Sequence, residues 1–130
     1  MVIIGAGPVG LAALITAQFY SPAFVIVIDT DPKRLKVATE IGAYATFNST
    51  EIGIDVVIKA VRDITDGKGC DTVIEAVGIP VTFELSQRLL APGGVLANAG
   101  VHGSKADLFL LDLWAKNISI ELRLLVCASI

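Results

Sequence analysis

The chain has 130 residues, of which 54% are hydrophobic and 18% charged, and its formal net charge is −3. High apolar content with a low net charge excludes a disordered chain, and ten Lys and Arg against thirteen Asp and Glu exclude the basic face of a general nucleic-acid binder. The length predicts a single domain over residues 1–130.

The expected elements alternate between strands and helices. In chain order they are a strand at 2–4, a helix at 8–20, a strand at 24–28, a helix at 33–41, a strand at 43–47, a helix at 55–64, a strand at 72–77, a helix at 81–90, a strand at 95–99, a short apolar helix at 107–115 and a strand at 118–126. This alternation predicts an α/β fold with a doubly wound parallel sheet of six strands, the Rossmann architecture.

Turn and cap residues support these boundaries. Asp31 precedes a proline and is a candidate N-cap, and Gly42 is a candidate C-terminal cap for the same helix. Lys59 and Asp63 have the i,i+4 spacing of a helical ion pair. The stretch 92–94, Pro-Gly-Gly, predicts a tight turn before the fifth strand.

No charged side chain precedes Asp29, which raises the possibility of a membrane span or a signal peptide. However, no Lys or Arg lies in this stretch, and several glycine and proline residues interrupt it below a spanning length. A buried strand–helix–strand unit explains the stretch better, because parallel sheets are covered on both faces. We therefore expect no membrane partner.

The cysteines and the one histidine do not form a metal-ligand pattern. Cys70 and Cys127 lie 57 residues apart, and we expect both to be packed thiols in a reducing compartment, which indicates a cytoplasmic protein. No metal site is expected in this chain.

The sequence from Gly5 to Gly10, GAGPVG, is a G-x-G-x-x-G motif between an expected strand and an expected helix. Asp29 lies 19 residues beyond Gly10, at the end of the second expected strand. This combination is typical of dinucleotide-binding βαβ units. Gly5 permits the sharp turn, Gly7 leaves room for the pyrophosphate, and Gly10 lets the helix pack against the sheet. The helix N-terminus favours the phosphates.

Asp29 is expected to accept hydrogen bonds from both ribose hydroxyls of an adenosine and to repel a 2′-phosphate, so that NAD is favoured over NADP. Asp31 is better placed than Asp29 to cap the following helix. Arg34 either flanks the ribose or is a solvated surface charge.

Two further turns, 76–78 and 99–101, follow the fourth and fifth strands at the same edge of the sheet. Glu75 is expected to be semi-buried and to bond a neighbouring loop rather than the ligand. His102 is expected to be a surface or hydrogen-bonded residue more readily than a proton carrier. The chain contains no Tyr-x-x-x-Lys pair and no P-loop, and we expect no catalytic residue in it.

Residues 2–119 resemble the cofactor-binding domain of the medium-chain, zinc-dependent alcohol dehydrogenases. The resemblance rests on VIIGAGPVGLAA, VIVIDTDPKRLKVATEIGA, DGKGCDTVIEAVG, RLLAPGGVLANAGVHG and LDLWAKNISI. It implies hydride transfer between NAD and an alcohol or aldehyde, with zinc polarising the oxygen. The family's zinc ligands and proton relay lie mainly in a separate domain that is absent here, so we expect cofactor binding without catalysis. Residues 121–130 depart from the family.

The resemblance also implies roles for individual residues. Asp29 and Arg34 would hold the adenosine ribose, Val77 would lie on the adenine side, and Gly100 and Val101 would meet the nicotinamide amide. The residues that would line the pyrophosphate are Gly5, Gly7, Pro8, Val9 and Gly10.

Two other functions share parts of this pattern. The stretch LLAPGGVL also resembles S-adenosylmethionine-dependent methyltransferases, but these usually carry an acid before the first glycine loop, where this chain has Ile3 and Ile4. A nucleotide-sensing regulatory domain of a channel or repressor shares the glycine loop and the acid of the second strand. The sixth strand and the Gly-Val-His-Gly turn favour the dehydrogenase.

Six of the seven residues from 108 to 114 have large apolar side chains, more than one helix face can bury. The last strand is expected at a sheet edge. An edge strand has unpaired backbone groups that pair readily with another copy. We therefore predict a homo-oligomer formed through the C-terminal edge strand.

Overall fold

The computed structural model describes residues 1–123, in which strands and helices alternate along the chain. The strands are β1 (Val2–Ile4), β2 (Ile26–Asp29), β3 (Ala45–Asn48), β4 (Cys70–Glu75), β5 (Leu90–Asn98) and β6 (Ser119–Leu122). The helices are α1 (Pro8–Gln18), α2 (Pro32–Ile41), α3 (Ser49–Ile52), α4 (Ile54–Ile64), α5 (Pro80–Leu89) and α6 (Leu110–Leu113), followed by a 3₁₀ turn, η1 (Trp114–Lys116).

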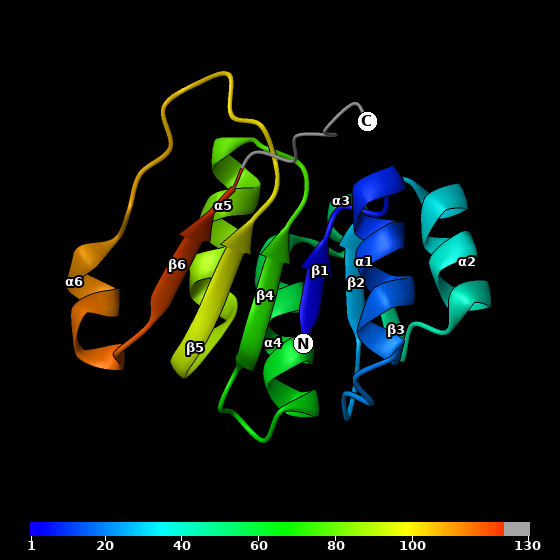
Figure 1. Ribbon diagram of the computed structural model, residues 1–130, viewed down its shortest axis with the longest axis horizontal. Coiled ribbons are helices and arrows are strands. Elements are labelled where there is room, and N and C mark those ends of the chain that lie inside the picture. The colour runs from blue at the N-terminus through cyan, green and yellow to red at the C-terminus, as the bar shows by residue number, and fades with distance from the viewer. Residues whose placement is uncertain (124–130) are drawn as a thin grey trace, which may run out of the picture.

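The six strands form one sheet in the order β3-β2-β1-β4-β5-β6, and every neighbouring pair is parallel (Figure 1). The predicted doubly wound α/β fold is therefore confirmed. The direction in which strands are added to the sheet reverses between β1 and β4: β2 and β3 extend it on one side of this pair, and β5 and β6 extend it on the other. Ligands of such sheets bind in the crevice at the carboxyl ends of the strands at this switch point.

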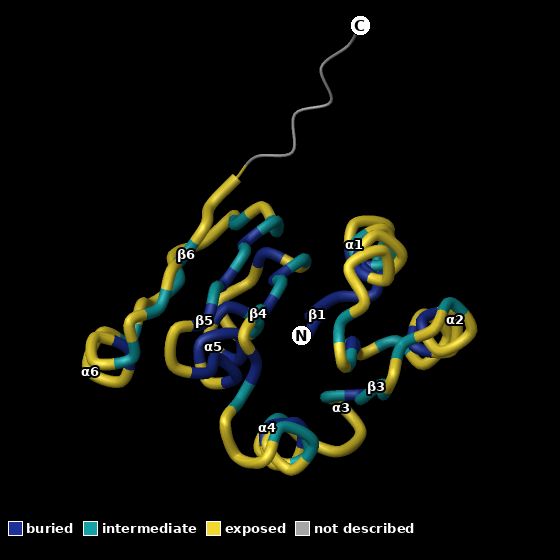
Figure 2. Tube along the Cα trace, turned by 60° about the horizontal axis from the view of Figure 1, so that its bottom comes forward, coloured by how far each residue is buried: buried dark blue, intermediate teal, exposed yellow. Residues whose placement is uncertain are grey.

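Two apolar cores lie on opposite faces of the sheet. One packs α1 and α2 against the sheet around Ile3 and Leu14, and the other packs α4 and α5 around Val57 and Leu96. Strands β1 and β2 are buried on both faces, whereas β6 and α6 are largely exposed (Figure 2). Continuous apolar strands such as β1 are what a sheet covered on both faces requires.

The cap predictions are confirmed. The Asp31 side chain accepts hydrogen bonds from the backbone N–H groups of Lys33 and Arg34 at 2.8 and 3.4 Å. Gly42 ends α2 in the left-handed conformation at a φ of 119°, and Lys59 pairs with Asp63 at 2.7 Å.

Several expected boundaries differ from the structure. Helix α1 ends at Gln18 rather than at residue 20, because Ser21 adopts a φ of 49°, outside the helical region. The expected tight turn at 92–94 lies within β5, where the pairing with β4 shifts register. Strand β4 ends at Glu75, so Val77 is in the loop that follows. Helix α3 was not expected; the Asn48 side chain caps it by accepting from the amides of Thr50 and Glu51.

The C-terminal predictions are met in part. Within the expected helix at 107–115, only α6 and η1 are helical. Strand β6 covers part of the expected range 118–126, and residues 124–126 lie outside the described residues. Cys70 is buried, as expected, and Cys127 lies outside the described residues. Among the helices of residues 1–123, none is both long and apolar enough to span a membrane.

Candidate functional site

The loop after β1 makes the sharp turn expected of its first glycine. Gly5 has a φ of +102°, and its N–H donates to the carbonyl of Ile28 at 2.8 Å. A Cβ at Gly5 would lie 2.9 Å from Cγ2 of Val77 and 3.1 Å from the carbonyl oxygen of Ala76. Both the backbone conformation and the space therefore restrict this position to glycine.

The other two glycines of the motif differ in what surrounds them. A Cβ at Gly10 would overlap the carbonyl oxygen of Gly5, so α1 packs directly on the turn. At Gly7 no atom lies within 4 Å of the place that a Cβ would take. The protein's own packing does not require glycine at this position, and the open space suits a ligand that approaches the backbone closely.

Helix α1 begins beside this open space. Its N-cap is Gly7, no side chain caps it, and Pro8 occupies the first turn. The first N–H groups of a helix have no partner within the helix, and together with the helix dipole they favour an anion. The loop can therefore hold a phosphate group with backbone donors alone.

Asp29 ends β2 next to this loop. Its Oδ2 accepts a hydrogen bond from the N–H of Ala6 at 2.6 Å, and its Oδ1 accepts from the N–H groups of Thr30 and Asp31 at 2.7 and 2.8 Å. These bonds fix the carboxylate against the glycine loop. Two carboxylate oxygens offer about four acceptor positions, so acceptor capacity remains for a ligand.

A pocket of about 330 Å³ opens between Asp29 and the loop after β4. It brings together five of the residues expected to bind the cofactor: Gly5, Gly7, Asp29, Arg34 and Val77. The Arg34 side chain is 56% exposed and lies 3.8 Å from the Asp31 carboxylate. The Arg34 guanidinium is therefore exposed at the rim of the pocket, where it can contact a ligand, and its ion pair with Asp31 is long.

The remaining expected residues lie outside this pocket. Gly10 is buried under the turn, and Pro8 and Val9 border a different hollow on the α1 side. Gly100 and Val101 belong to the loop after β5, which contacts the loop after β4 at Gly78. These two loops follow adjacent strands at the same edge of the sheet.

Glu75 is more deeply buried than the sequence suggested. Its side chain has no exposed surface, and it accepts bonds from the N–H groups of Val77 and Gly78 and from the Thr82 hydroxyl. The expectation that it bonds a neighbouring loop is confirmed. His102 is hydrogen-bonded, as expected: its Nε2 lies 2.9 Å from Oδ1 of Asn98. The sequence signal for such a buried anchor is the position of Glu75 at the end of the strand, directly after the apolar pair Val73 and Ile74.

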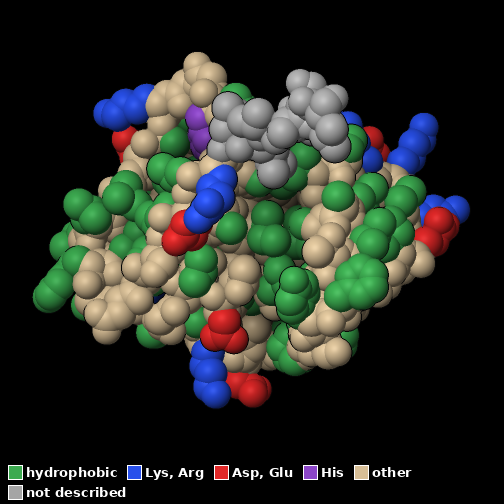
Figure 3. Space-filling view, in the orientation of Figure 1, with side chains coloured by type: hydrophobic (Ala, Val, Ile, Leu, Met, Phe, Trp, Pro, Cys, Tyr) green, Lys and Arg blue, Asp and Glu red, His purple; other side chains and the backbone are tan. Residues whose placement is uncertain are grey.

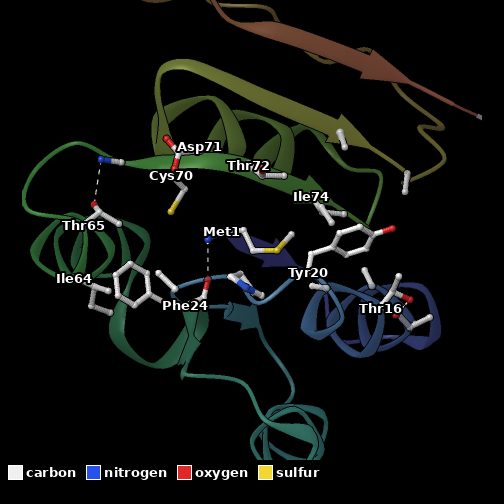
Figure 4. A pocket seen from close by; sticks show the side chains of 18 of the residues that line it. Met1, Thr16, Tyr20, Phe24, Ile64, Thr65, Cys70, Asp71, Thr72 and Ile74 are labelled. Atoms are coloured by element: carbon white, nitrogen blue, oxygen red, sulfur yellow. Dashed lines mark hydrogen bonds between the residues drawn. The ribbon is translucent and has the colours of Figure 1, made fainter.

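A larger hollow lies elsewhere, along α1 on the face where no helix of residues 1–123 covers β4 and β5. It measures about 1140 Å³, and Figure 3 shows many hydrophobic side chains on this face. In Figure 4, Phe24, Ile64 and Cys70 gather at one end and Tyr20 and Ile74 at the other. Burial raises the pKa of the Cys70 thiol, which keeps it protonated at neutral pH.

This groove does not have the features of a phosphate site. Its interactions are internal: the N-terminal ammonium of Met1 donates to the Phe24 carbonyl at 2.8 Å, and the N–H of Gly69 donates to the Thr65 hydroxyl at 3.1 Å. The glycine turn and Asp29 lie at the smaller pocket, which is therefore the candidate site. Within residues 1–123, no three His, Cys, Asp or Glu side chains are grouped so that they could hold a metal ion.

Comparison with known proteins relates this chain to zinc-type alcohol dehydrogenases. Residues 8–127 match the family model described as "Zinc-binding dehydrogenase". The chain is 37% identical to zinc-type alcohol dehydrogenase B of Aspergillus flavus over 94% of this chain and 28% of that protein. It is also 38% identical to an alcohol dehydrogenase of Cupriavidus necator over 75% of this chain and 26% of that protein.

Solved structures agree with this match. Zinc dependent alcohol dehydrogenase 2 from Streptococcus pneumonia, in its apo form, superposes with a TM-score of 0.90 at 49% identity, covering 95% of this chain and 35% of that one. A zinc-binding dehydrogenase from Sinorhizobium meliloti, bound to NADP, superposes with a TM-score of 0.85 at 26% identity, covering 95% and 36%. The chain thus spans between about a quarter and about a third of the length of these relatives.

Proposed function

The chain belongs to the zinc-binding dehydrogenase family, and from this premise we propose that it is the NAD(H)-binding domain of an alcohol dehydrogenase. The parent enzyme would transfer a hydride between NAD and an alcohol or aldehyde. The observation that carries the proposal is the open glycine turn at Gly7 beside the fixed carboxylate of Asp29. Because the chain spans only part of its relatives, we assign it cofactor binding and assign catalysis to the longer enzyme.

The pocket suggests how the dinucleotide would lie. Asp29 and Arg34 would receive the adenosine ribose, and the N-terminus of α1 at Gly7 would receive the pyrophosphate. Val77 lines the same pocket and would lie on the adenine side. The loop that carries Gly100 and Val101 would receive the nicotinamide half, because it ends a strand on the other side of the switch point. Once bound, NAD supplies the hydride-accepting ring, which this chain orients.

The location and the partners of the enzyme follow from its cysteine and its fold. We propose a cytoplasmic location, since Cys70 is a buried thiol, which suits a reducing compartment. The partners would be the dinucleotide, the substrate of the full enzyme and a second copy of the chain. We assign no nucleic-acid or membrane partner.

A titration of the purified chain with NADH tests the proposal. We expect saturable binding that ADP-ribose displaces, because the pocket at Asp29 would hold the adenosine half that both molecules share. S-adenosylmethionine should not compete, and the chain alone should not oxidise alcohols. Binding of S-adenosylmethionine in place of NADH would instead support the methyltransferase, which, like the regulatory domain, finds no support in the family match.

Zinc would belong to the rest of the parent enzyme. Residues 1–123 offer no grouped ligands for it, and a structural or catalytic zinc site needs three or four side-chain ligands. We predict that the purified chain holds no stoichiometric zinc. Metal analysis by mass spectrometry after dialysis checks this, and one tightly bound zinc per chain would contradict it.

A further inference from the structure

The loop that joins β5 to α6, residues 99–109, has few backbone anchors. The N–H groups of its first two residues both donate to the carbonyl of Glu75, at 2.8 and 3.0 Å. From residue 101 to residue 106, no backbone–backbone hydrogen bond joins the loop to another part of residues 1–123. Figure 1 shows this stretch as the long gold loop between β5 and α6. Its conformation therefore depends on side chains.

The Asn98 side chain makes two hydrogen bonds at the start of this loop. Asn98 is the last residue of β5 and is buried. Its Nδ2 donates to the carbonyl of Gly100 at 2.9 Å, and its Oδ1 lies 2.9 Å from Nε2 of His102. Because the amide nitrogen is used on Gly100, the amide oxygen faces the imidazole, and Nε2 is the donor. One side chain thus holds the chain on both sides of Val101.

The contacts of His102 are those of an anchor rather than those of a packing residue. Its side chain is 21% exposed, and its ring meets the buried ring of Phe83 edge-on, with the centroids 5.6 Å apart. Its Nδ1 is buried and has no hydrogen-bond partner among residues 1–123. A buried polar atom without a partner costs folding free energy, and a phenylalanine would fill the same space without that cost. What histidine adds at this position is the bond from Nε2 to Asn98.

The loop after β4 is anchored separately from this pair. The Glu75 carboxylate accepts hydrogen bonds from the N–H groups of Val77 and Gly78, at 3.0 and 2.9 Å. Nε2 of His102 lies 3.6 Å from Oε2 of the same carboxylate, beyond hydrogen-bond distance. Neither His102 nor Asn98 lines the pocket proposed for the adenosine half. Loss of the bond between them therefore leaves that pocket in place.

The position of Val101 connects the pair to the ligand. Its side chain is 75% exposed in the loop at the carboxyl end of β5. A dinucleotide spans both halves of a doubly wound sheet, and in the proposed function its nicotinamide half lies toward this loop. A carboxamide offers one acceptor oxygen and one NH₂ donor, which peptide groups can match. The place of the backbone at Val101 then decides how well the nicotinamide carboxamide is bound.

Resting on the function proposed above, we propose that Asn98 and His102 are positioning residues that hold the start of this loop where the nicotinamide carboxamide binds. A Cβ at Gly78 would overlap the backbone of Val101, so the loop is already packed as closely against the loop after β4 as two backbones allow. Without the bond from Nε2, the loop can therefore move only away from β4. The adenosine half keeps its site.

His102→Phe tests this proposal, because it keeps a ring against Phe83 and removes the Nε2 donor. We expect NADH to bind about tenfold more weakly, as loss of one hydrogen bond allows, and ADP-ribose, which lacks the nicotinamide, to change less than about threefold. The nicotinamide fluorescence of NADH, titrated directly and displaced with ADP-ribose, gives both affinities. The melting temperature should be unchanged or higher, since the variant also removes the unpartnered Nδ1.

Two further variants and a control separate positioning from general loss of stability. His102→Gln places an amide N–H donor near the position of Nε2 and should restore most of the affinity for NADH. Asn98→Leu removes both bonds and should change the ratio of NADH to ADP-ribose affinity in the same direction as His102→Phe, by a larger factor. Gln87→Leu is the matched control, because the buried Gln87 anchors the other end of the same loop through the Asp107 carbonyl and the Phe109 N–H. It should lower the melting temperature and leave the ratio unchanged.

The outcomes separate the two proposals. If the wild-type chain binds neither NADH nor ADP-ribose, the proposed function fails, and this inference fails with it. If the chain binds both and His102→Phe weakens them equally, or changes neither, the proposed function stands and the pair does not position the nicotinamide. Should His102→Phe not fold, an unchanged ratio in Asn98→Leu overturns the inference.

Discussion

Asp29→Ser is expected to lower the affinity of the chain for NADH by about 10- to 100-fold, because bonds from the ribose hydroxyls to a charged acceptor contribute roughly 1.5–3 kcal/mol. The same change should raise the affinity for NADPH. A 2′-phosphate beside the wild-type carboxylate is repelled, and serine removes that repulsion while offering a hydroxyl donor. The preference for NADH over NADPH should therefore collapse or reverse.

The structure explains why this residue has so large an effect. The Asp29 carboxylate is held by the N–H groups of Ala6, Thr30 and Asp31, so it cannot turn away from an incoming phosphate. Arg34 lines the same pocket and would gain a phosphate partner in the variant. The relative from Sinorhizobium meliloti is bound to NADP, so cofactor choice is a property to be tested for each chain.

Parallel titrations with NADH and NADPH at fixed ionic strength measure the preference. Asp31→Asn is the matched control, since it removes the same charge two residues away and asparagine caps a helix as well as aspartate. The control should keep the wild-type preference. Equal binding of NADPH and NADH by the wild-type chain would show that Asp29 does not select NAD.

Local sequence rules account for the parts of this fold that are decided by neighbours along the chain. The run from Val2 to Ile4, the motif from Gly5 to Gly10 and the acid Asp29 each have a strong local signal, and together they predict the βαβ unit. The order of the strands follows because right-handed crossovers leave few alternatives. The cap at Asp31 is equally local.

Features that depend on distant contacts were less predictable. The sequence suggested a semi-buried Glu75, whereas the structure buries it completely under two loops that are brought together only by the pairing of β4 with β5. The stretch 92–94 has strong turn residues, and the structure places it inside β5 at the register shift, between the pairs Cys70–Leu90 and Thr72–Val95. The turn residues thus produce an irregularity within the strand rather than its beginning.

The residues of the pocket also divide into those that local sequence predicts and those that depend on distant contacts. Gly5, Gly7, Asp29 and Arg34 follow the first two strands, and the structure places them at one pocket. Val77, in the loop after β4, also lines this pocket, whereas Gly100 and Val101, in the loop after β5, lie beyond it. The sequence identifies these loops by their glycines but does not show that their backbones meet at Gly78 and Val101.

The last prediction concerns self-association through β6, which ends the strand order and pairs only with β5 among the described residues. The segment before it leaves large apolar side chains exposed: Leu111 is 86% and Trp114 75% exposed. Such a combination of an open strand edge and a neighbouring apolar surface favours pairing with another copy. A two-fold axis at this edge would join two six-stranded sheets into one.

Ile120→Pro tests this edge, and the structure shows why it is the suitable position. The N–H of Arg123 points toward β5, where it lies 3.5 Å from the Asn98 carbonyl. Because N–H groups alternate between the two sides of a strand, the N–H of Glu121 also points toward β5 and that of Ile120 points outward. Proline at Ile120 therefore removes a donor from the free edge and leaves the bonds to β5 in place.

We expect the wild-type chain to be a discrete dimer by multi-angle light scattering and Ile120→Pro to be a monomer that still binds NADH. Ile120→Val is the matched control: it keeps the outward N–H and a β-branched side chain, and it should remain a dimer. Loss of an edge pairing of several backbone hydrogen bonds, each contributing about 0.5–1.5 kcal/mol, is enough to shift the association constant by several orders of magnitude. A monomeric wild-type chain would contradict the prediction, as would polydisperse aggregates, because a closed two-fold interface yields one size only.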